Sequence, residues 1–158
     1  MSPAEWRRTI DVDLVGQFLC ARRAVPMLKK SPNGAIVNMS SVAGRLGYAF
    51  RTPYAAAKWG VIGFTQSLAR ELGPHGIRVN AILPGVVAGR RIEQVIAARA
   101  ETLGLSYAEM EKQLLDKVSL RRMVTAEDVA ETVVFLCSSK GRNISGQSIS
   151  VDGNVETL

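Results

Sequence analysis

A tyrosine and a lysine four residues apart form the pair in this sequence best suited to proton transfer. Tyr54 and Lys58, in the segment YAAAK, lie in a region with helical periodicity, so both side chains are expected on one helix face. An ammonium group close to a phenol favours the phenolate, and such a phenol can give a proton to a carbonyl oxygen or take one from an alcohol. A Tyr–Lys pair at this spacing is by itself more often surface packing, so its neighbours must support the interpretation.

Two serines supply that support, because they follow a short β-branched segment. Ser40 and Ser41 end this segment, and Ser41 lies thirteen residues before Tyr54. The carboxyl ends of parallel strands face the crevice in which α/β proteins bind ligands. The Ser41 hydroxyl is therefore expected to hydrogen-bond the same substrate oxygen as Tyr54. Pro84-Gly85 follows the next predicted strand and forms a turn at the same edge of the sheet.

The elements that must position these residues alternate between helix and strand. Ser2, Ser106 and Thr125 each precede an acidic residue by three positions, the pattern of a capping box at a helix start. The strand–helix–strand order is typical of a right-handed βαβ unit, so the sequence predicts a doubly wound, Rossmann-like α/β fold with a parallel sheet. The predicted helices span residues 3–31, 53–73, 90–103, 106–118 and 126–139, and the predicted strands span 34–40, 77–83 and 146–151.

The predicted sheet is only partial. A Rossmann-type sheet opens with a strand, a glycine-rich turn and a helix, and this turn holds the pyrophosphate of a dinucleotide. No turn of the form Gly-x-Gly-x-x-Gly or Gly-x-x-x-Gly-x-Gly follows a predicted strand in this sequence. We therefore expect one incomplete domain over residues 1–158.

Composition excludes several classes of protein. The net charge is +6, but the basic residues are dispersed without aromatic residues between them, which favours a solvated surface over nucleic-acid binding. No apolar run approaches the roughly 18 residues of a membrane span, and the first residues contain no secretory signal. Cys20 and Cys137 lie in apolar helical patterns and His75 is the single histidine. We expect buried thiols, no disulfide, no metal site and a cytoplasmic location.

Taken together, these segments resemble the short-chain dehydrogenases/reductases, and most closely their 3-oxoacyl-reductase-like members. The resemblance extends over almost the whole sequence, in which the matching segments occur in the family's order. They are IDVDLVGQF at 10–18, IVNMSS at 36–41, YAAAK at 54–58, VNAILPG at 79–85 and ISGQSISVDG at 144–153.

The resemblance implies an oxidoreductase that uses NAD or NADP to transfer a hydride between the nicotinamide and a carbonyl or secondary alcohol. Tyr54 is implied as the acid/base, and Ser41 as the group that positions the substrate oxygen. Lys58 is implied to support Tyr54 and to bind the nicotinamide ribose, to which Tyr54 also lies close. The remaining cofactor contacts would come from Pro84, Gly85 and the backbone of Val87. The helices over 90–120 would form a substrate lid.

Two positions depart from the family pattern. Asp13 stands where an asparagine is usual, whose backbone carbonyl supports a water relay to the lysine; aspartate keeps that carbonyl but adds a charge. Gly89 stands where a threonine usually binds the cofactor. Arg90 or Arg91 would instead meet a phosphate or an acidic substrate there, although an exposed basic helix start is the more common role for such residues.

The part of the family fold that this sequence does not contain, roughly 90 residues for three βα units, leaves three interpretations. The chain belongs to an oxidoreductase of small carbonyl or alcohol substrates, which is our main interpretation. Alternatively, it is a non-catalytic association module for a full-length paralogue, or an inactive fragment of poor solubility with uncovered strand edges. Oligomers of the family associate through helices that correspond to 3–31 and 53–73, so we expect a homo-oligomer. The substrate and the choice between NAD and NADP stay open.

Overall fold

A parallel sheet forms the centre of the molecule. The computed structural model describes residues 1–156, in which three strands, β1 (Ala35–Met39), β2 (Arg78–Pro84) and β3 (Ser148–Val151), pair in the order β1-β2-β3. Both pairings are parallel. β2 lies between the other two strands and is buried over nearly its full length. The predicted parallel α/β sheet is therefore confirmed.

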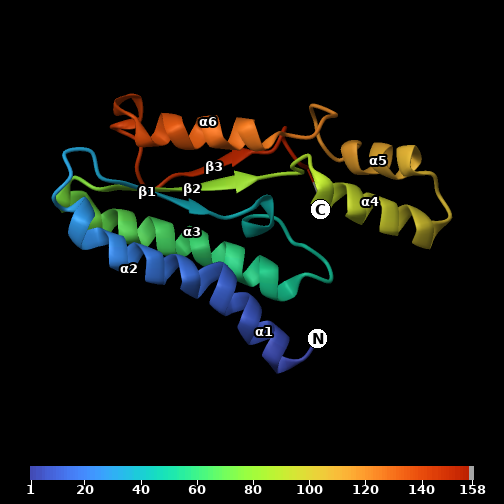
Figure 1. Ribbon diagram of the computed structural model, residues 1–158, viewed down its shortest axis with the longest axis horizontal. Coiled ribbons are helices and arrows are strands. Elements are labelled where there is room, and N and C mark those ends of the chain that lie inside the picture. Colours follow the sequence, from blue (N-terminus) through green and yellow to red (C-terminus); the bar gives the residue numbers. More distant parts are fainter. Residues whose placement is uncertain (157–158) are drawn as a thin grey trace.

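Helices cover both faces of the sheet and extend beyond one end of it (Figure 1). One face carries α2 (Gly16–Leu28) and α3 (Thr52–Leu72), with α1 (Pro3–Ile10) leading into α2 from outside the sheet, and the other face carries α6 (Ala126–Cys137). Past the carboxyl ends of the strands lie α4 (Arg90–Leu103) and α5 (Tyr107–Leu115). This arrangement puts a helical pair over the strand ends, where ligands bind in α/β proteins.

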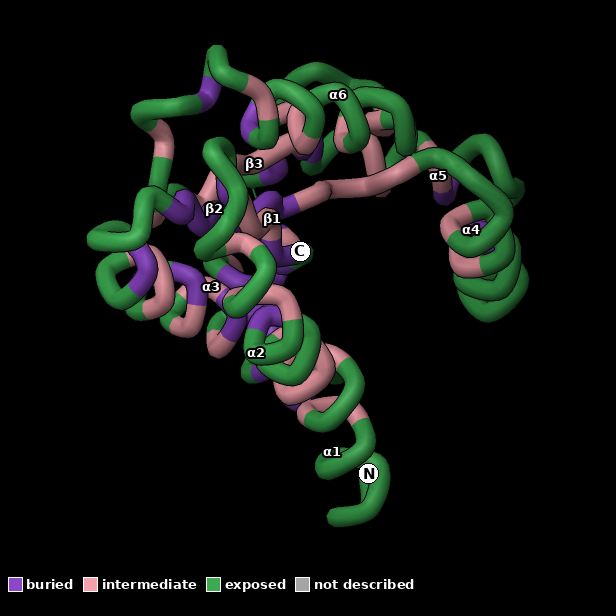
Figure 2. The backbone as a smooth tube through the Cα atoms, turned by 60° about the vertical axis from the view of Figure 1, so that its left-hand side comes forward, coloured by how far each residue is buried: buried purple, intermediate pink, exposed green. Residues whose placement is uncertain are grey.

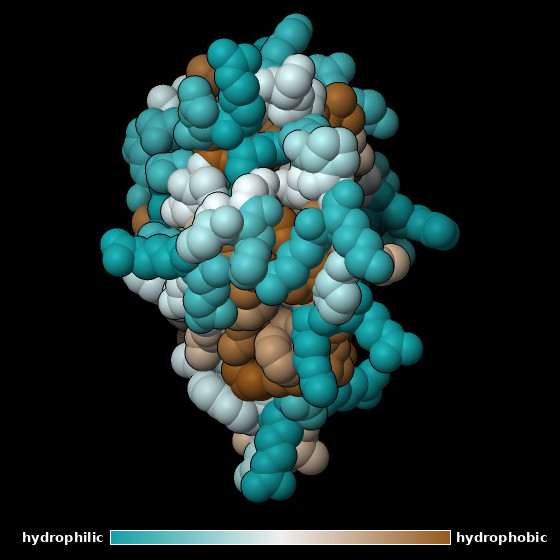
Figure 3. Space-filling model, turned by 90° about the vertical axis from the view of Figure 1, so that its left-hand side faces the viewer, coloured by the Kyte–Doolittle hydropathy of each residue, from teal (hydrophilic) through white to brown (hydrophobic). Residues whose placement is uncertain are grey.

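Burial follows these layers. Buried residues gather in the strands and in the adjacent face of α3, whereas α1 projects from the body of the molecule and has no buried residue (Figure 2). At the end of the molecule where the strands begin, hydrophilic side chains surround a smaller apolar area (Figure 3).

The prediction of one continuous helix over residues 3–31 is wrong. A π-helical turn, Asp11–Val15, separates α1 from α2, and α2 ends at Leu28. The extra residue in this turn lies where the chain packs against α3, so closely that a Cβ at Gly60 would be 2.8 Å from Leu14 Cδ2. A regular period of 3.6 residues does not reveal one π turn, and such turns are frequent at functional sites. The other predicted elements are present, with ends that differ by at most three residues.

The three predicted capping boxes are confirmed. At the start of α6, for example, the Thr125 N–H donates to Asp128 Oδ2 over 2.7 Å, and the Asp128 N–H donates to Thr125 Oγ1 over 3.1 Å. The backbone hydrogen bond from Thr125, with a smaller contribution from its side chain, holds the pKa of Asp128 below its ordinary value. Ser2 with Glu5 and Ser106 with Glu109 form the same reciprocal pairs.

The prediction of buried cysteines is wrong, because Cys20 and Cys137 are both exposed. Cys20 precedes Ala21, the buried residue of α2, and consecutive residues of a helix are about 100° apart around its axis. Cys137 follows the buried Leu136 in the last turn of α6. Within residues 1–156, none of the helices has the length and apolar character that crossing a bilayer requires. The same residues offer no group of three His, Cys, Asp or Glu side chains that would hold a metal ion.

A buried arginine fastens the beginning of β2 to the end of α6. Arg78 is 8% exposed, and its guanidinium donates to the carbonyl oxygens of Leu136 and Gly141 and to Asn33 Oδ1. These contacts satisfy carbonyl groups that the end of α6 and the following turn leave without helical partners. They also hold α6 against the sheet.

We predict that Arg78→Met lowers the free energy of unfolding by about 3 kcal/mol, since two buried carbonyl groups would lose a charged donor. Urea unfolding followed by circular dichroism measures the change. Arg142→Met is the matched control, because Arg142 is an exposed arginine just beyond the same turn. Equal urea midpoints of unfolding for the two variants would contradict the proposed role of Arg78 in holding α6 against the sheet.

Candidate active site

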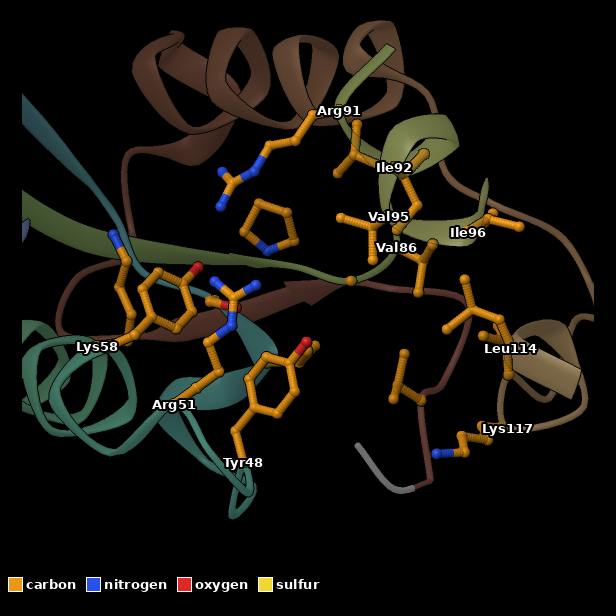
Figure 4. A pocket seen from close by; sticks show the side chains of 18 of the residues that line it. Tyr48, Arg51, Lys58, Val86, Arg91, Ile92, Val95, Ile96, Leu114 and Lys117 are labelled. Atoms are coloured by element: carbon orange, nitrogen blue, oxygen red, sulfur yellow. The ribbon is translucent and has the colours of Figure 1, made fainter. Parts of the chain in front are cut away.

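A cavity of about 560 Å³ lies at the carboxyl ends of β1 and β2, beside α4 and α5 (Figure 4). Its lining includes side chains and backbone from the π turn, the end of β1, the start of α3 and the turn after β2. All the site residues predicted from the sequence are among them: Asp13, Ser41, Tyr54, Lys58, Pro84, Gly85 and Val87. The fold thus brings these residues together, while their chemical roles stay predictions.

The two serines after β1 occupy different positions. Ser40 is 3% exposed, and its hydroxyl donates to the carbonyl oxygen of Lys58 over 2.8 Å, which ties the strand end to α3. Ser41 Oγ accepts a hydrogen bond from the Ala43 N–H over 3.2 Å. This leaves the hydroxyl hydrogen of Ser41 able to donate at the cavity.

Gly44 makes the close approach of β1 and α3 possible. A Cβ at this position would lie 2.5 Å from Ser40 Oγ and 2.8 Å from the carbonyl oxygen of Lys58. The sequence analysis did not identify this residue, and the available signal was a glycine five positions after Met39, the last residue of β1.

Lys58 is buried and its ammonium group has several partners. Nζ lies 3.1 Å from Asp13 Oδ1 and donates to the carbonyl oxygen of Met39 over 3.2 Å. The same atom is 5.4 Å from the centroid of the Tyr54 ring, one turn earlier on α3. The Lys58 side chain is 8% exposed and that of Asp13 27%, so this ion pair is better shielded from solvent than a surface pair. The positive charge therefore stands beside the tyrosine.

Gln17 completes this network and was missed by the sequence analysis. Its amide Nε2 donates to the backbone carbonyls of Asp13, over 2.8 Å, and Met39, over 3.1 Å. Its Oε1 accepts from the Met39 N–H over 3.0 Å. Asp13 therefore contacts Lys58 through its carboxylate, while its backbone carbonyl, the atom expected to support a water relay, accepts from Gln17. The signal was an amide in the apolar stretch that follows Asp13.

The opposite wall comes from the turn after β2. Gly85 packs against the segment after β3, since a Cβ there would lie 2.6 Å from Asp152 Cβ. The Val86 carbonyl accepts from the Val124 N–H over 3.0 Å, and the Ala88 N–H donates to the Val124 carbonyl over 2.8 Å. These contacts fix the backbone that leads from β2 into α4. The glycine of Pro84-Gly85 is thus required for packing, whatever its role toward a cofactor.

α4 and α5 close the cavity from above. They pack on each other through a buried cluster of Ile96, Ala100 and Met110, and the left-handed Gly104, with φ +67°, joins them. Figure 4 shows Ile92, Val95 and Leu114 on the inner side of this pair. The segment predicted as a substrate lid, 90–120, therefore lies over the cavity.

Comparison with known protein families gives one match that spans nearly the whole chain. The family model described as "Enoyl-(Acyl carrier protein) reductase" matches residues 1–155. A 3-oxoacyl-[acyl-carrier-protein] reductase of Staphylococcus aureus is 39% identical over 155 residues, which are 98% of this chain and 58% of the relative. Trans-4-hydroxycyclohexanecarboxylate dehydrogenase of Sinomonas cyclohexanicum is 38% identical over 149 residues, 94% of this chain and 51% of the relative. The chain thus spans between half and three-fifths of the length of these curated relatives.

Solved structures agree with the sequence relatives. Sorbitol-6-phosphate 2-dehydrogenase from Erwinia amylovora superposes with a TM-score of 0.91 at 32% identity, over 100% of this chain and 62% of that one. A 3-oxoacyl-[acyl-carrier protein] reductase with bound NAD from Brucella melitensis gives 0.82 at 34% identity, over 100% and 54%. The predicted Rossmann-like fold is confirmed by these neighbours. The chain belongs to the short-chain dehydrogenase/reductase family and is similar to its 3-oxoacyl reductases.

Proposed function

We propose that this cavity is the acid/base and substrate site of an NAD(P)-dependent oxidoreductase that interconverts a small carbonyl compound and a secondary alcohol. The observation that carries the proposal is the meeting of Tyr54, Ser41 and the buried Lys58 ammonium at one cavity, at the carboxyl ends of the strands. The family membership of the chain supports the reaction class.

Each of these residues has a distinct task in the proposal. The Tyr54 phenol gives a proton to the carbonyl oxygen during reduction, or takes one from the alcohol during oxidation. The Ser41 hydroxyl donates a hydrogen bond to the same oxygen and holds it near the phenol. The Lys58 ammonium stabilises negative charge on the Tyr54 oxygen as the proton leaves.

The donors of Lys58 also suit a cofactor. An ammonium group has three N–H donors, and Asp13 and Met39 take two of them. The third is left for a ribose hydroxyl or for the phenol oxygen. The backbone of Pro84, Gly85 and Val87 lies on the facing wall, where a nicotinamide carboxamide would find hydrogen-bonding groups. When bound, NAD or NADP supplies or accepts the hydride.

In this assignment the cavity accommodates the nicotinamide end of the dinucleotide. Within residues 1–156, no strand is followed by a glycine-rich turn of the kind that holds a pyrophosphate. The lid role of 90–120 belongs to the same proposal, and its support is the position of α4 and α5 over the cavity. A cytoplasmic location stays a prediction from the sequence.

Association with a second chain is part of the proposal, and in the alternative interpretation it is the whole function. Large apolar side chains are exposed on the elements expected to form an interface. Where exposed apolar side chains form a contiguous patch, the patch marks a protein contact. The residues are Trp6 on α1, Val12 in the π turn, Phe18 and Leu19 on α2, and Trp59 on α3, each at least 41% exposed. A homo-oligomer through α1–α2 and α3 would cover them.

Nucleotide titration tests the catalytic interpretation directly. We expect weak but saturable binding of NADH or NADPH to the chain through the nicotinamide end, measured by nucleotide fluorescence. Tyr54→Phe should keep this binding and lower hydride transfer at least about a hundredfold, since a phenyl ring has no proton to exchange. A folded sample that binds neither nucleotide would favour the non-catalytic association module instead.

The adjacent serines give a second, internally controlled test. Ser41→Ala should change the unfolding midpoint little and reduce hydride transfer strongly. Ser40→Ala should lower the free energy of unfolding by about 1–3 kcal/mol, because the buried carbonyl of Lys58 loses its donor. The reverse pattern, with stability lost at Ser41 and activity lost only at Ser40, would contradict the assigned roles.

A further inference from the structure

The cavity has a strong excess of positive charge. Of its lining residues within 1–156, five side chains are cationic and only Asp13 is acidic. Asp13 is already paired with Lys58. The four remaining cationic side chains are Arg51, Arg91, Arg99 and Lys117. A site built only for a neutral carbonyl compound has no need of this charge.

Two of these residues point into the cavity from opposite walls. Figure 4 shows Arg51, from the residue before α3, and Arg91, from the first turn of α4, with their guanidinium groups directed toward one another. The Arg51 guanidinium carbon is 5.9 Å from the centroid of the Tyr48 ring, a contact that orients the group without neutralising it. Among the described residues, neither arginine has a carboxylate within ion-pair distance.

The position of Arg91 has an electrostatic cost in the free chain. The first turn of a helix carries the positive end of the helix dipole, so a cation there is unfavourable. Arg90 and Arg91 both lie in this turn of α4. The Arg91 side chain is exposed to solvent, but it lies along the wall of the cavity.

We propose that the substrate of this cavity carries a carboxylate group, which Arg51 and Arg91 bind together. A guanidinium presents paired N–H donors that match the two carboxylate oxygens. A short apolar chain would join this anion to the reacting carbon, while Ile92, Val95 and Leu114 line the wall of the cavity that lies farther from Lys58. The assignment of the reacting carbon to Tyr54 and Ser41 rests on the function proposed above. The anion site can be tested without catalysis.

Calorimetry on the 158-residue chain, without nucleotide, tests the anion site. The probes are the short oxo acids acetoacetate, levulinate and 5-oxohexanoate, each compared with its neutral ethyl ester. At least one acid should bind about tenfold more tightly than its ester. Arg51→Gln and Arg91→Gln should each remove most of this preference. Arg142→Gln is the control, since Arg142 is exposed and lies outside the cavity.

Two further measurements distinguish an anion of the substrate from an anion of the cofactor, and the anion site from the catalytic function. Tyr54→Phe should retain the preference for the acid even though it abolishes hydride transfer, so a failed reaction leaves the anion site intact. Inorganic pyrophosphate stands in for the cofactor. If the arginine variants weaken pyrophosphate and NADH binding but leave the acid-to-ester ratio unchanged, the arginines serve the cofactor and the substrate assignment is overturned. Equal binding of acid and ester, or binding of neither by a folded chain, overturns it as well.

Discussion

A buried ammonium group must be paired, and the pairing of Lys58 holds the site together. An unpaired charge in the interior costs several kcal/mol, so the elements around Lys58 have to supply acceptors. They do so from two directions, the carboxylate of Asp13 in the π turn and the carbonyl of Met39 at the end of β1. Gln17 links the backbones of Asp13 and Met39 to each other through three hydrogen bonds. The charge on α3 thereby fixes a helix, a strand end and the π turn at one place.

The same constraint accounts for the local irregularities. The π turn adds a residue where the chain passes α3, and the Asp13 carboxylate it carries contacts Lys58. Gly44 and Gly60 then allow the neighbouring segments to approach α3 at distances that a Cβ would obstruct. Packing on this scale restricts Ser41 and Tyr54 to the edge of the cavity, because the groups beside them have few other positions. A catalytic site needs this kind of support from its surroundings to keep its geometry.

The chemistry-bearing residues were predictable from the sequence because they depend on regular spacing. Tyr54 and Lys58 share a helix face, and Ser41 and Gly85 follow parallel strands, so period and strand order are enough to bring them to one edge of the sheet. The π turn and Gln17 were not predictable in the same way, since both depend on contacts between segments far apart in the chain. The exposure of Cys20 was missed for a related reason: an apolar helix pattern identifies a face, but tertiary packing decides which part of it is covered.

The cavity divides its positive charges between two environments with different physical consequences. Lys58 is buried and paired, so its charge acts at short range, on the tyrosine one turn away. Arg51 and Arg91 are exposed to solvent and have no carboxylate partner within the described residues, so their charge is free to act on an incoming molecule. Lysine suits the first environment as a compact point charge, and arginine suits the second because its planar group binds two oxygens at once.

A ligand anion that reaches both arginines would also bring α4 toward α3, since one guanidinium comes from each side. Recognition of charge and closure of the helical pair over the reacting carbon would then be one event, which excludes water when the substrate is in place.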